Sequence, residues 1–275
     1  MRAKKLIILY AVVLFLVVFA VTFNCVCAIA RFDVKFEVSS MTEEAQRVQA
    51  RLEEEYGGKS YLFFGQEDVE AIVLEEGGGY LTVESFSKTF PNVIHAKVRE
   101  KLEVLSVKVG DKYYAIDKDN TILAINNTAA NNVSGNNPAL YGVSFAEAQV
   151  GDKLTAAAED AEAFAAFKGI FEKNENNEIE EILARIRSNV VAMRYSKEFA
   201  DLEYGGADLY IEMREGVCVW IIDPLEGFWE KMKSAMEAYL GLGDAQRTYG
   251  YITVASADGE ADYRAEEPPF SVAEQ

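Results

Sequence analysis

The chain has 275 residues, of which 50% are hydrophobic, 27 are Lys or Arg and 45 are Asp or Glu. The formal net charge of −18 argues against a nucleic-acid-binding protein, which needs a basic surface to displace counterions from phosphate, and against docking on anionic lipid. The length accommodates one or two domains, each with its own hydrophobic core.

Three cysteines and one histidine leave little material for catalytic or metal chemistry. Cys25 and Cys27 lie close together and Cys218 stands alone, so no spacing of metal ligands appears. The chain contains no P-loop, dinucleotide fingerprint, nucleophile elbow or His-Glu-x-x-His motif. We therefore expect no enzymatic activity, no cofactor, no metal and no small-molecule substrate. An extracellular hydrolase that uses a carboxylate pair stays open as an alternative, because carboxylates are abundant.

The N-terminus combines a basic start, MRAKK, with an uncharged apolar run over residues 6–23. An apolar run of roughly 18 residues or more is long enough to span a bilayer as a helix, and the basic flank is expected to stay in the cytoplasm. We predict a cytoplasmic tail at 1–5 and a single transmembrane signal anchor at 6–28, with the rest of the chain outside the cell membrane. A signal peptide cleaved after Ala30 is the alternative.

A small α+β domain is predicted directly afterwards, over residues 31–101. The alternation in RFDVKFEVS is typical of a half-buried strand, and two helical segments that each end at glycines follow. Two strand-like runs then flank the turn Phe90-Pro91-Asn92. The order strand, helix, helix, strand, strand favours two helices on one face of a three-stranded sheet.

A second domain of mixed strands and helices is predicted over residues 102–265. KVGDKYYAIDKDNTILAI indicates two successive hairpins, and ADLYIEMREGVCVWIIDP a third. Two apolar stripes at helical spacing lie between them, after a polar loop at 126–138. A helix over about 227–240 and two strands near 250–255 and 260–264 complete the domain. The polar, proline-containing residues 266–275 are expected to form a disordered tail.

Two groups of charged residues have alternative explanations. His95, Lys97 and Arg99 share one face of a predicted strand, which is either a solvated surface paired with nearby acids or a docking surface. Asp117 and Asp119 flank a hairpin, where they serve the turn or bind a cation weakly.

The stretch VESFSKTFPNVIHAKVREKLEVLSVKVGDKYYAIDKDNTIL resembles the FtsQ/DivIB family of bacterial cell-division proteins. The shared features are the proline at the turn, the glutamate at the strand end and a Tyr-x-Ile-Asp strand closed by a polar hairpin. Lys101 stands where the family usually has arginine, and Asn120 where it usually has glycine. Residues 126–198 do not align with the family pattern.

The resemblance implies a POTRA domain at 31–101 followed by the family's β-domain at 102–265. It implies a non-enzymatic, bitopic membrane scaffold of the divisome at the division septum. Its expected partners are small bitopic coiled-coil proteins of the FtsL/DivIC and FtsB type, which regulate septal peptidoglycan synthesis.

In that family, the last strand of the β-domain accepts a partner strand at the sheet edge. The resemblance carries partner binding to Tyr251, Gly259, Glu260, Ala261, Asp262, Tyr263 and Arg264, with the two tyrosines as anchors. It also implies a POTRA docking surface that includes Lys97 and Arg99. The alternative is an exported cell-wall or adhesion binding module with a POTRA-like fold that is not tied to division.

Overall fold

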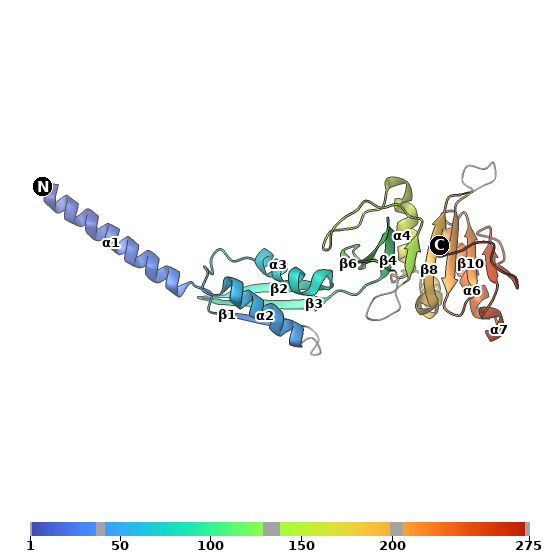
Figure 1. Cartoon of the computed structure of the whole chain (residues 1–275), viewed down its shortest axis with the longest axis horizontal. Coiled ribbons are helices and arrows are strands. Elements are labelled where there is room, and N and C mark those ends of the chain that lie inside the picture. The colour runs from blue at the N-terminus through green and yellow to red at the C-terminus, as the bar shows by residue number, and fades with distance from the viewer. Residues whose placement is uncertain (1, 37–41, 129–137, 199–205, 273–275) are drawn as a thin grey trace. The chain divides into compact units, whose positions relative to one another are not determined.

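The computed structural model describes residues 2–36, 42–128, 138–198 and 206–272 (Figure 1). The fold is α+β, with seven α-helices and twelve strands within those ranges. The chain divides into two compact units, Met1–Lys101 and Leu102–Gln275. Each unit contains one β-sheet.

The N-terminal helix α1 covers Arg2–Val26, so it begins inside the predicted cytoplasmic tail. Its described side chains from residue 10 to residue 22 are all exposed. Among the residues whose side chains are described, no helix is both long enough and apolar enough to cross a bilayer. The predicted transmembrane helix at 6–28 is therefore wrong for the described chain.

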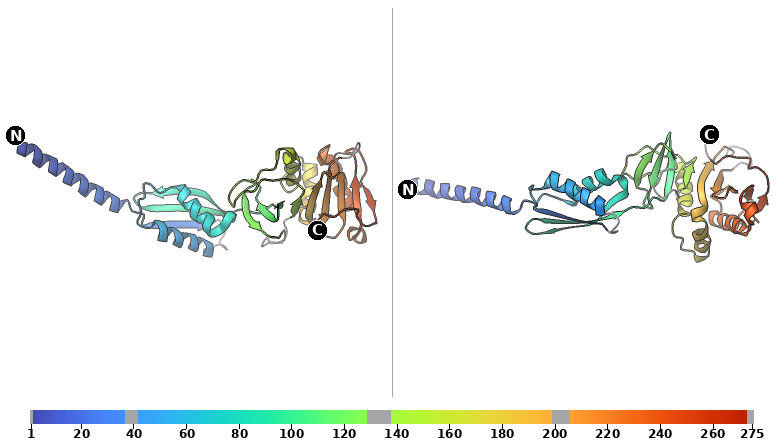
Figure 2. Two further views of the ribbon diagram at one scale, coloured as in Figure 1. Left: turned by 45° about the horizontal axis from the view of Figure 1, so that its top comes forward. Right: turned by 60° about the horizontal axis from the view of Figure 1, so that its bottom comes forward.

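The first unit contains a three-stranded sheet in the order β1-β3-β2. Strand β3 (Val93–Glu100) pairs parallel with β1 (Arg31–Phe36) and antiparallel with β2 (Leu81–Thr89). Helices α2 (Thr42–Tyr56) and α3 (Gln66–Gly77), followed by the short 3-10 turn Gly78–Tyr80, cover one face of this sheet (Figure 2). The predicted order strand, helix, helix, strand, strand is confirmed.

The core of the first unit lies between this sheet and the two helices. Every second residue of β1 and β3 faces the helices, because side chains alternate along a strand. The most deeply buried members include Phe32, Val48, Leu52, Val69, Ile94 and Val98.

The second unit contains a nine-stranded mixed sheet in the order β12-β11-β10-β9-β8-β7-β4-β5-β6. Its strands are β4 (Leu105–Val109), β5 (Lys112–Ile116), β6 (Ile122–Asn126), β7 (Ala139–Tyr141), β8 (Val190–Ser196), β9 (Asp208–Met213), β10 (Cys218–Ile222), β11 (Tyr251–Val254) and β12 (Asp262–Arg264). Strand β7 is parallel to both of its neighbours, and β10 is parallel to β11. Residues 129–137 of the predicted loop lie outside the described residues.

One face of this sheet packs against helices, and here the main core of the unit lies. The helices are α4 (Ala161–Gly169), α5 (Asn177–Ile186) and α6 (Phe228–Gly241), with the short α7 (Asp244–Arg247) after them. Short 3-10 turns precede α4 at Ala158–Asp160 and follow α5 at Arg187–Asn189. Both predicted apolar stripes face this core through residues such as Phe167 and Ile186.

The chain after β12 runs back across the opposite face of the sheet (Figure 1). Phe270 stacks on Tyr210, with 4.0 Å between ring centroids, and Val272 is buried. The expectation of a disordered tail at 266–275 is therefore wrong for residues 266–272. A stacked aromatic ring and a buried aliphatic side chain fix the backbone of this polar segment. Residues 273–275 lie outside the described residues.

Candidate functional site

The predicted partner-binding strand is the outermost strand of the nine-stranded sheet. Strand β12 pairs antiparallel with β11, with Tyr263 opposite Ile252, and among the described residues no strand lies beyond it. In an antiparallel pair, alternate residues turn their N–H and C=O groups away from the neighbouring strand. At least one residue of this three-residue strand therefore directs its backbone groups outward. Such an edge is able to accept a further strand.

Tyr263 anchors β12 to its own unit from the helical side of the sheet. Its ring packs against the main core beside Ala261. Its hydroxyl donates to the carbonyl oxygens of Tyr249 at 3.0 Å and Gln246 at 3.3 Å. The side chain thus ties the strand to α7 and to the segment between α7 and β11. Tyr263 was predicted to anchor a partner. In the structure, its side chain anchors β12 to its own unit.

Tyr251 faces the other side of the sheet. Tyr263 lies opposite Ile252, and Tyr251 is the residue next to Ile252, so its side chain points to the opposite face. It is 3% exposed, and its hydroxyl donates to the Glu266 carboxylate at 2.9 Å. Phe270 lies edge-on to its ring, with 6.0 Å between centroids. The two tyrosines predicted to act together therefore lie on opposite faces, and Tyr251 is covered by the tail.

The remaining predicted residues form the approach to β12 and its exposed border. Gly259 accepts a hydrogen bond from the Ser234 hydroxyl on α6 at 3.3 Å. Glu260, Asp262 and Arg264 are exposed. The Arg264 guanidinium lies 3.3 Å from the Asp262 carboxylate, and exposed pairs of this kind contribute little to stability. These three side chains are the ones that a partner strand would meet first.

The opposite edge of the same sheet is partly covered by the chain itself. The N–H of Ile122 on β6 donates to the Asp152 carbonyl, and the N–H of Gly151 donates to the Ile122 carbonyl, both at 2.9 Å. Thr121 forms an isolated bridge with Lys153. The two edges therefore differ, and β12 is the edge better placed to accept a partner.

One of the two basic residues of the predicted docking surface in the first unit is paired with a carboxylate. Strand β2 has a bulge between Val83 and Ser85, and Glu84, the extra residue, reaches the Lys97 ammonium at 2.6 Å. This hydrogen bond holds the pKa of Glu84 below its usual range. Arg99 is exposed. Lys97, one of the basic residues of this predicted surface, is thus paired with a carboxylate from the neighbouring strand.

The single histidine belongs to the same outer face of the three-stranded sheet. The Nδ1 atom of His95 lies 3.1 Å from the Asp33 carboxylate, and its Nε2 atom lies 3.1 Å from the Thr89 hydroxyl. Hydrogen bonding with His95, followed by the charge of Lys35, lowers the pKa of Asp33. The carboxylate, imidazole and hydroxyl follow the order of a catalytic triad. However, Thr89 is exposed, and the open hollow of about 360 Å³ that Asp33 and His95 line does not include it. A hydroxyl outside the hollow is poorly placed to attack a substrate bound there.

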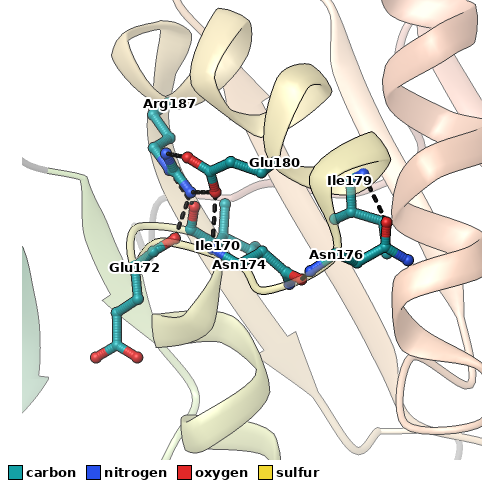
Figure 3. Close-up of polar contacts among 7 residues, drawn as sticks. All are labelled: Ile170, Glu172, Asn174, Asn176, Ile179, Glu180 and Arg187. Atoms are coloured by element: carbon teal, nitrogen blue, oxygen red, sulfur yellow. Dashed lines mark hydrogen bonds and ion pairs between the residues drawn. The ribbon is translucent and has the colours of Figure 1, made fainter.

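Two further polar clusters of the second unit are structural. The Arg187 guanidinium donates to the Glu180 carboxylate through both terminal nitrogens, at 2.7 and 2.8 Å, and to the carbonyls of Ile170 and Glu172 (Figure 3). These contacts join the end of α4 to α5. In the β5–β6 hairpin, the buried Asp117 carboxylate accepts from the N–H groups of Asp119 and Thr121, both at 2.8 Å, which is turn chemistry.

Within the described ranges, no group of three or more His, Cys, Asp or Glu residues is arranged to hold a metal ion. A comparison with models of known protein families gives no match, and neither does a comparison with curated protein sequences.

Sequence reasoning missed the aromatic residues on the open face of the large sheet. Tyr210 and Trp220 lie opposite each other on β9 and β10. Strand alternation within the predicted hairpin places them on one face, so this pair was available as a signal. The Phe270 ring in an otherwise polar tail was a second signal, although the neighbouring sequence does not predict where this ring packs.

Proposed function

We propose that this protein is a non-enzymatic scaffold of the bacterial division machinery, similar in role to the FtsQ/DivIB family. In this proposal it acts at the division septum. It holds small coiled-coil division proteins of the FtsL/DivIC and FtsB type by accepting one of their strands beside β12. The partners in turn regulate septal peptidoglycan synthesis.

The observation that carries this proposal is the position of β12 at the open end of the sheet. Main-chain hydrogen bonds to an added strand supply affinity, and the side chains that flank the edge supply specificity. Glu260, Asp262 and Arg264 are exposed at this border. Further support comes from the strand, helix, helix, strand, strand order of the first unit and from the sequence resemblance.

The structure also changes which residue should be used to test the site. Replacing Tyr263 would loosen β12 itself, because its hydroxyl and ring hold the strand to its own unit. Asp262 is exposed, and its carboxylate pairs with the exposed guanidinium of Arg264 in the same strand. A substitution at Asp262 therefore tests binding at the strand edge and leaves in place the Tyr263 contacts that hold β12 to its own unit.

The experiment is photo-cross-linking in dividing cells with a photoreactive amino acid at Asp262. The matched control places it at Asp111, an exposed residue in the turn between β4 and β5. We expect an adduct with a small coiled-coil division protein from position 262 and none from position 111. Equal adducts from both positions, or none from 262, would contradict the edge-strand site.

A fluorescent fusion tests the cellular context separately. A band at midcell that follows constriction is expected for a division scaffold. An even distribution over the cell would remove the division role and favour an exported binding module with the same fold.

A further inference from the structure

The open face of the nine-stranded sheet carries a row of large side chains on neighbouring strands. Arg194 on β8 lies opposite Tyr210 on β9, and Tyr210 lies opposite Trp220 on β10. Tyr251 follows on β11. Side chains directly opposite on paired strands lie within contact distance. Tyr251 lies opposite Cys218, two residues from Trp220, and its ring centroid is 6.3 Å from that of Trp220. The four side chains therefore form one continuous strip across the sheet. This aromatic strip is Arg194, Tyr210, Trp220 and Tyr251.

A buried carboxylate holds two of these rings in place. Asp208 is 5% exposed, and its two oxygens accept separate hydrogen bonds. One comes from the Trp220 indole N–H at 2.9 Å, and the other comes from the Tyr210 hydroxyl at 3.1 Å. Burial, followed by the charge of Asp208, raises the pKa of Tyr210, which keeps its hydroxyl protonated as a donor. Because both partners belong to the sheet, the rings are oriented without help from the tail.

The C-terminal segment crosses this strip from one end to the other. Glu266 accepts from the Tyr251 hydroxyl at 2.9 Å. Phe270 stacks on Tyr210 at 4.0 Å between centroids, and it lies edge-on to Trp220 at 5.8 Å. The Ser271 carbonyl then accepts from the Arg194 guanidinium at 3.1 Å. The contacts follow the sequence of the segment in order, as they do for a bound extended peptide.

The segment itself has the composition of a peptide ligand rather than of a core element. Between Glu266 and Phe270 it reads Glu-Pro-Pro, and this stretch contributes no buried side chain. Two consecutive prolines keep it extended before it docks, which lowers the entropy lost on binding. Phe270 and Val272 are its apolar contacts with the sheet.

We propose that the aromatic strip is a peptide-binding site, and that residues 266–272 are its resident ligand. The ligand class is an extended, proline-containing segment with a carboxylate four residues before an aromatic ring. A partner that presents such a segment competes with the tail for the strip. The inference does not rest on the proposed function, since the strip lies on a face of the sheet and the edge site lies at its border.

The test uses Trp220 as the reporter, in a Trp229→Phe background that leaves Trp220 as the single tryptophan. A chain that ends at Arg264 is titrated with a synthetic peptide of residues 265–275. Truncation is expected to red-shift Trp220 emission, and the peptide is expected to reverse the shift saturably. A peptide with the Phe270→Ala change should bind at least about tenfold more weakly, the loss of a central aromatic anchor.

A matched pair of sheet variants checks the polar end of the strip. Arg194→Gln removes the donor to the Ser271 carbonyl and should weaken peptide binding. Arg185→Gln, at an exposed position on α5, should leave it unchanged. The proposal would be overturned if the folded truncated chain did not bind the wild-type peptide. It would also be overturned if that chain bound the wild-type and Phe270→Ala peptides equally tightly.

If the truncated chain does not fold, the full-length Phe270→Ala variant replaces it. The peptide should bind this variant and be resisted by the wild-type chain, whose own tail occupies the strip at high effective concentration. Equal binding to both full-length chains, or to neither, would overturn the proposal.

Discussion

The stability of the second unit should depend on the hydroxyl of Tyr239. This residue of α6 is fully buried. Its hydroxyl donates to the Glu215 carboxylate at 2.5 Å and accepts from the Asn189 amide at 3.1 Å. Burial, with the hydrogen bond to Glu215, raises the pKa of Tyr239 to about 12. The hydroxyl thus joins α6 to the β9–β10 turn and to the segment before β8.

Replacing Tyr239 by Phe keeps the ring and opens no cavity, so the loss is confined to the hydrogen bonds. A hydrogen bond to a charged group contributes roughly 1.5–3 kcal/mol. Glu215 is exposed and regains water when its donor is removed, which offsets part of that loss. We expect the free energy of unfolding to fall by about 1–2 kcal/mol. With a urea slope of roughly 2 kcal/mol per molar, the midpoint should fall by roughly 0.5–1 M.

Equilibrium unfolding in urea, followed by tryptophan fluorescence, measures this change in the intact chain. Both tryptophans of the protein, Trp220 and Trp229, lie in the second unit, so the signal reports that unit alone. Tyr249→Phe is the control, because that side chain is 51% exposed and its midpoint should not move. An unchanged midpoint for Tyr239→Phe would refute the reasoning. So would a loss above about 4 kcal/mol, which indicates a repacked core.

Three further predictions concern pH, backbone conformation and thiol reactivity. Hydrogen bonding to Arg187 lowers the pKa of Glu180 from 4.5 to about 2. This pair should therefore stabilise the fold above pH 4.5 and lose that effect as the pH falls toward 2. A Glu180→Gln variant should show a flatter acid-unfolding profile, and an identical profile would contradict the assignment. Gly142→Ala should lower the melting temperature more than Gly110→Ala. Both glycines have positive φ, but only at Gly142 would a Cβ meet a backbone oxygen, at 1.8 Å; equal losses would show that this crowding is relieved. Burial raises the pKa of the Cys218 thiol to about 11, so at pH 8 iodoacetamide should alkylate it roughly a hundredfold more slowly than free cysteine, as measured by mass spectrometry.

Local signals were sufficient where neighbouring residues decide the structure. The order of elements in the first unit followed from strand alternation, from glycines at helix ends and from the proline turn. The predicted strand near 260–264 corresponds to β12, and the helix near 227–240 corresponds to α6. The helix has a periodic apolar face, and the strand follows a turn signal at Asp258-Gly259.

Contacts between distant segments could not be predicted from these local signals. Strand β7 is three residues long, yet it joins β8 to β4 in the middle of the sheet. The pairing of Glu84 with Lys97 depends on a bulge, which the sequence pattern does not reveal. The apolar run at the N-terminus predicted a membrane span that the described residues do not support.

The sequence by itself determined the acidic character of the protein, its α+β composition and the presence of a strand near residues 260–264. Only the tertiary structure decided that Tyr251 and Tyr263 face opposite sides of that sheet, and that Phe270 docks on Tyr210. The physical reason is that periodicity specifies which residues of one strand share a face. Strand order, register and the docking of a tail depend on free energies between segments that are far apart in the chain.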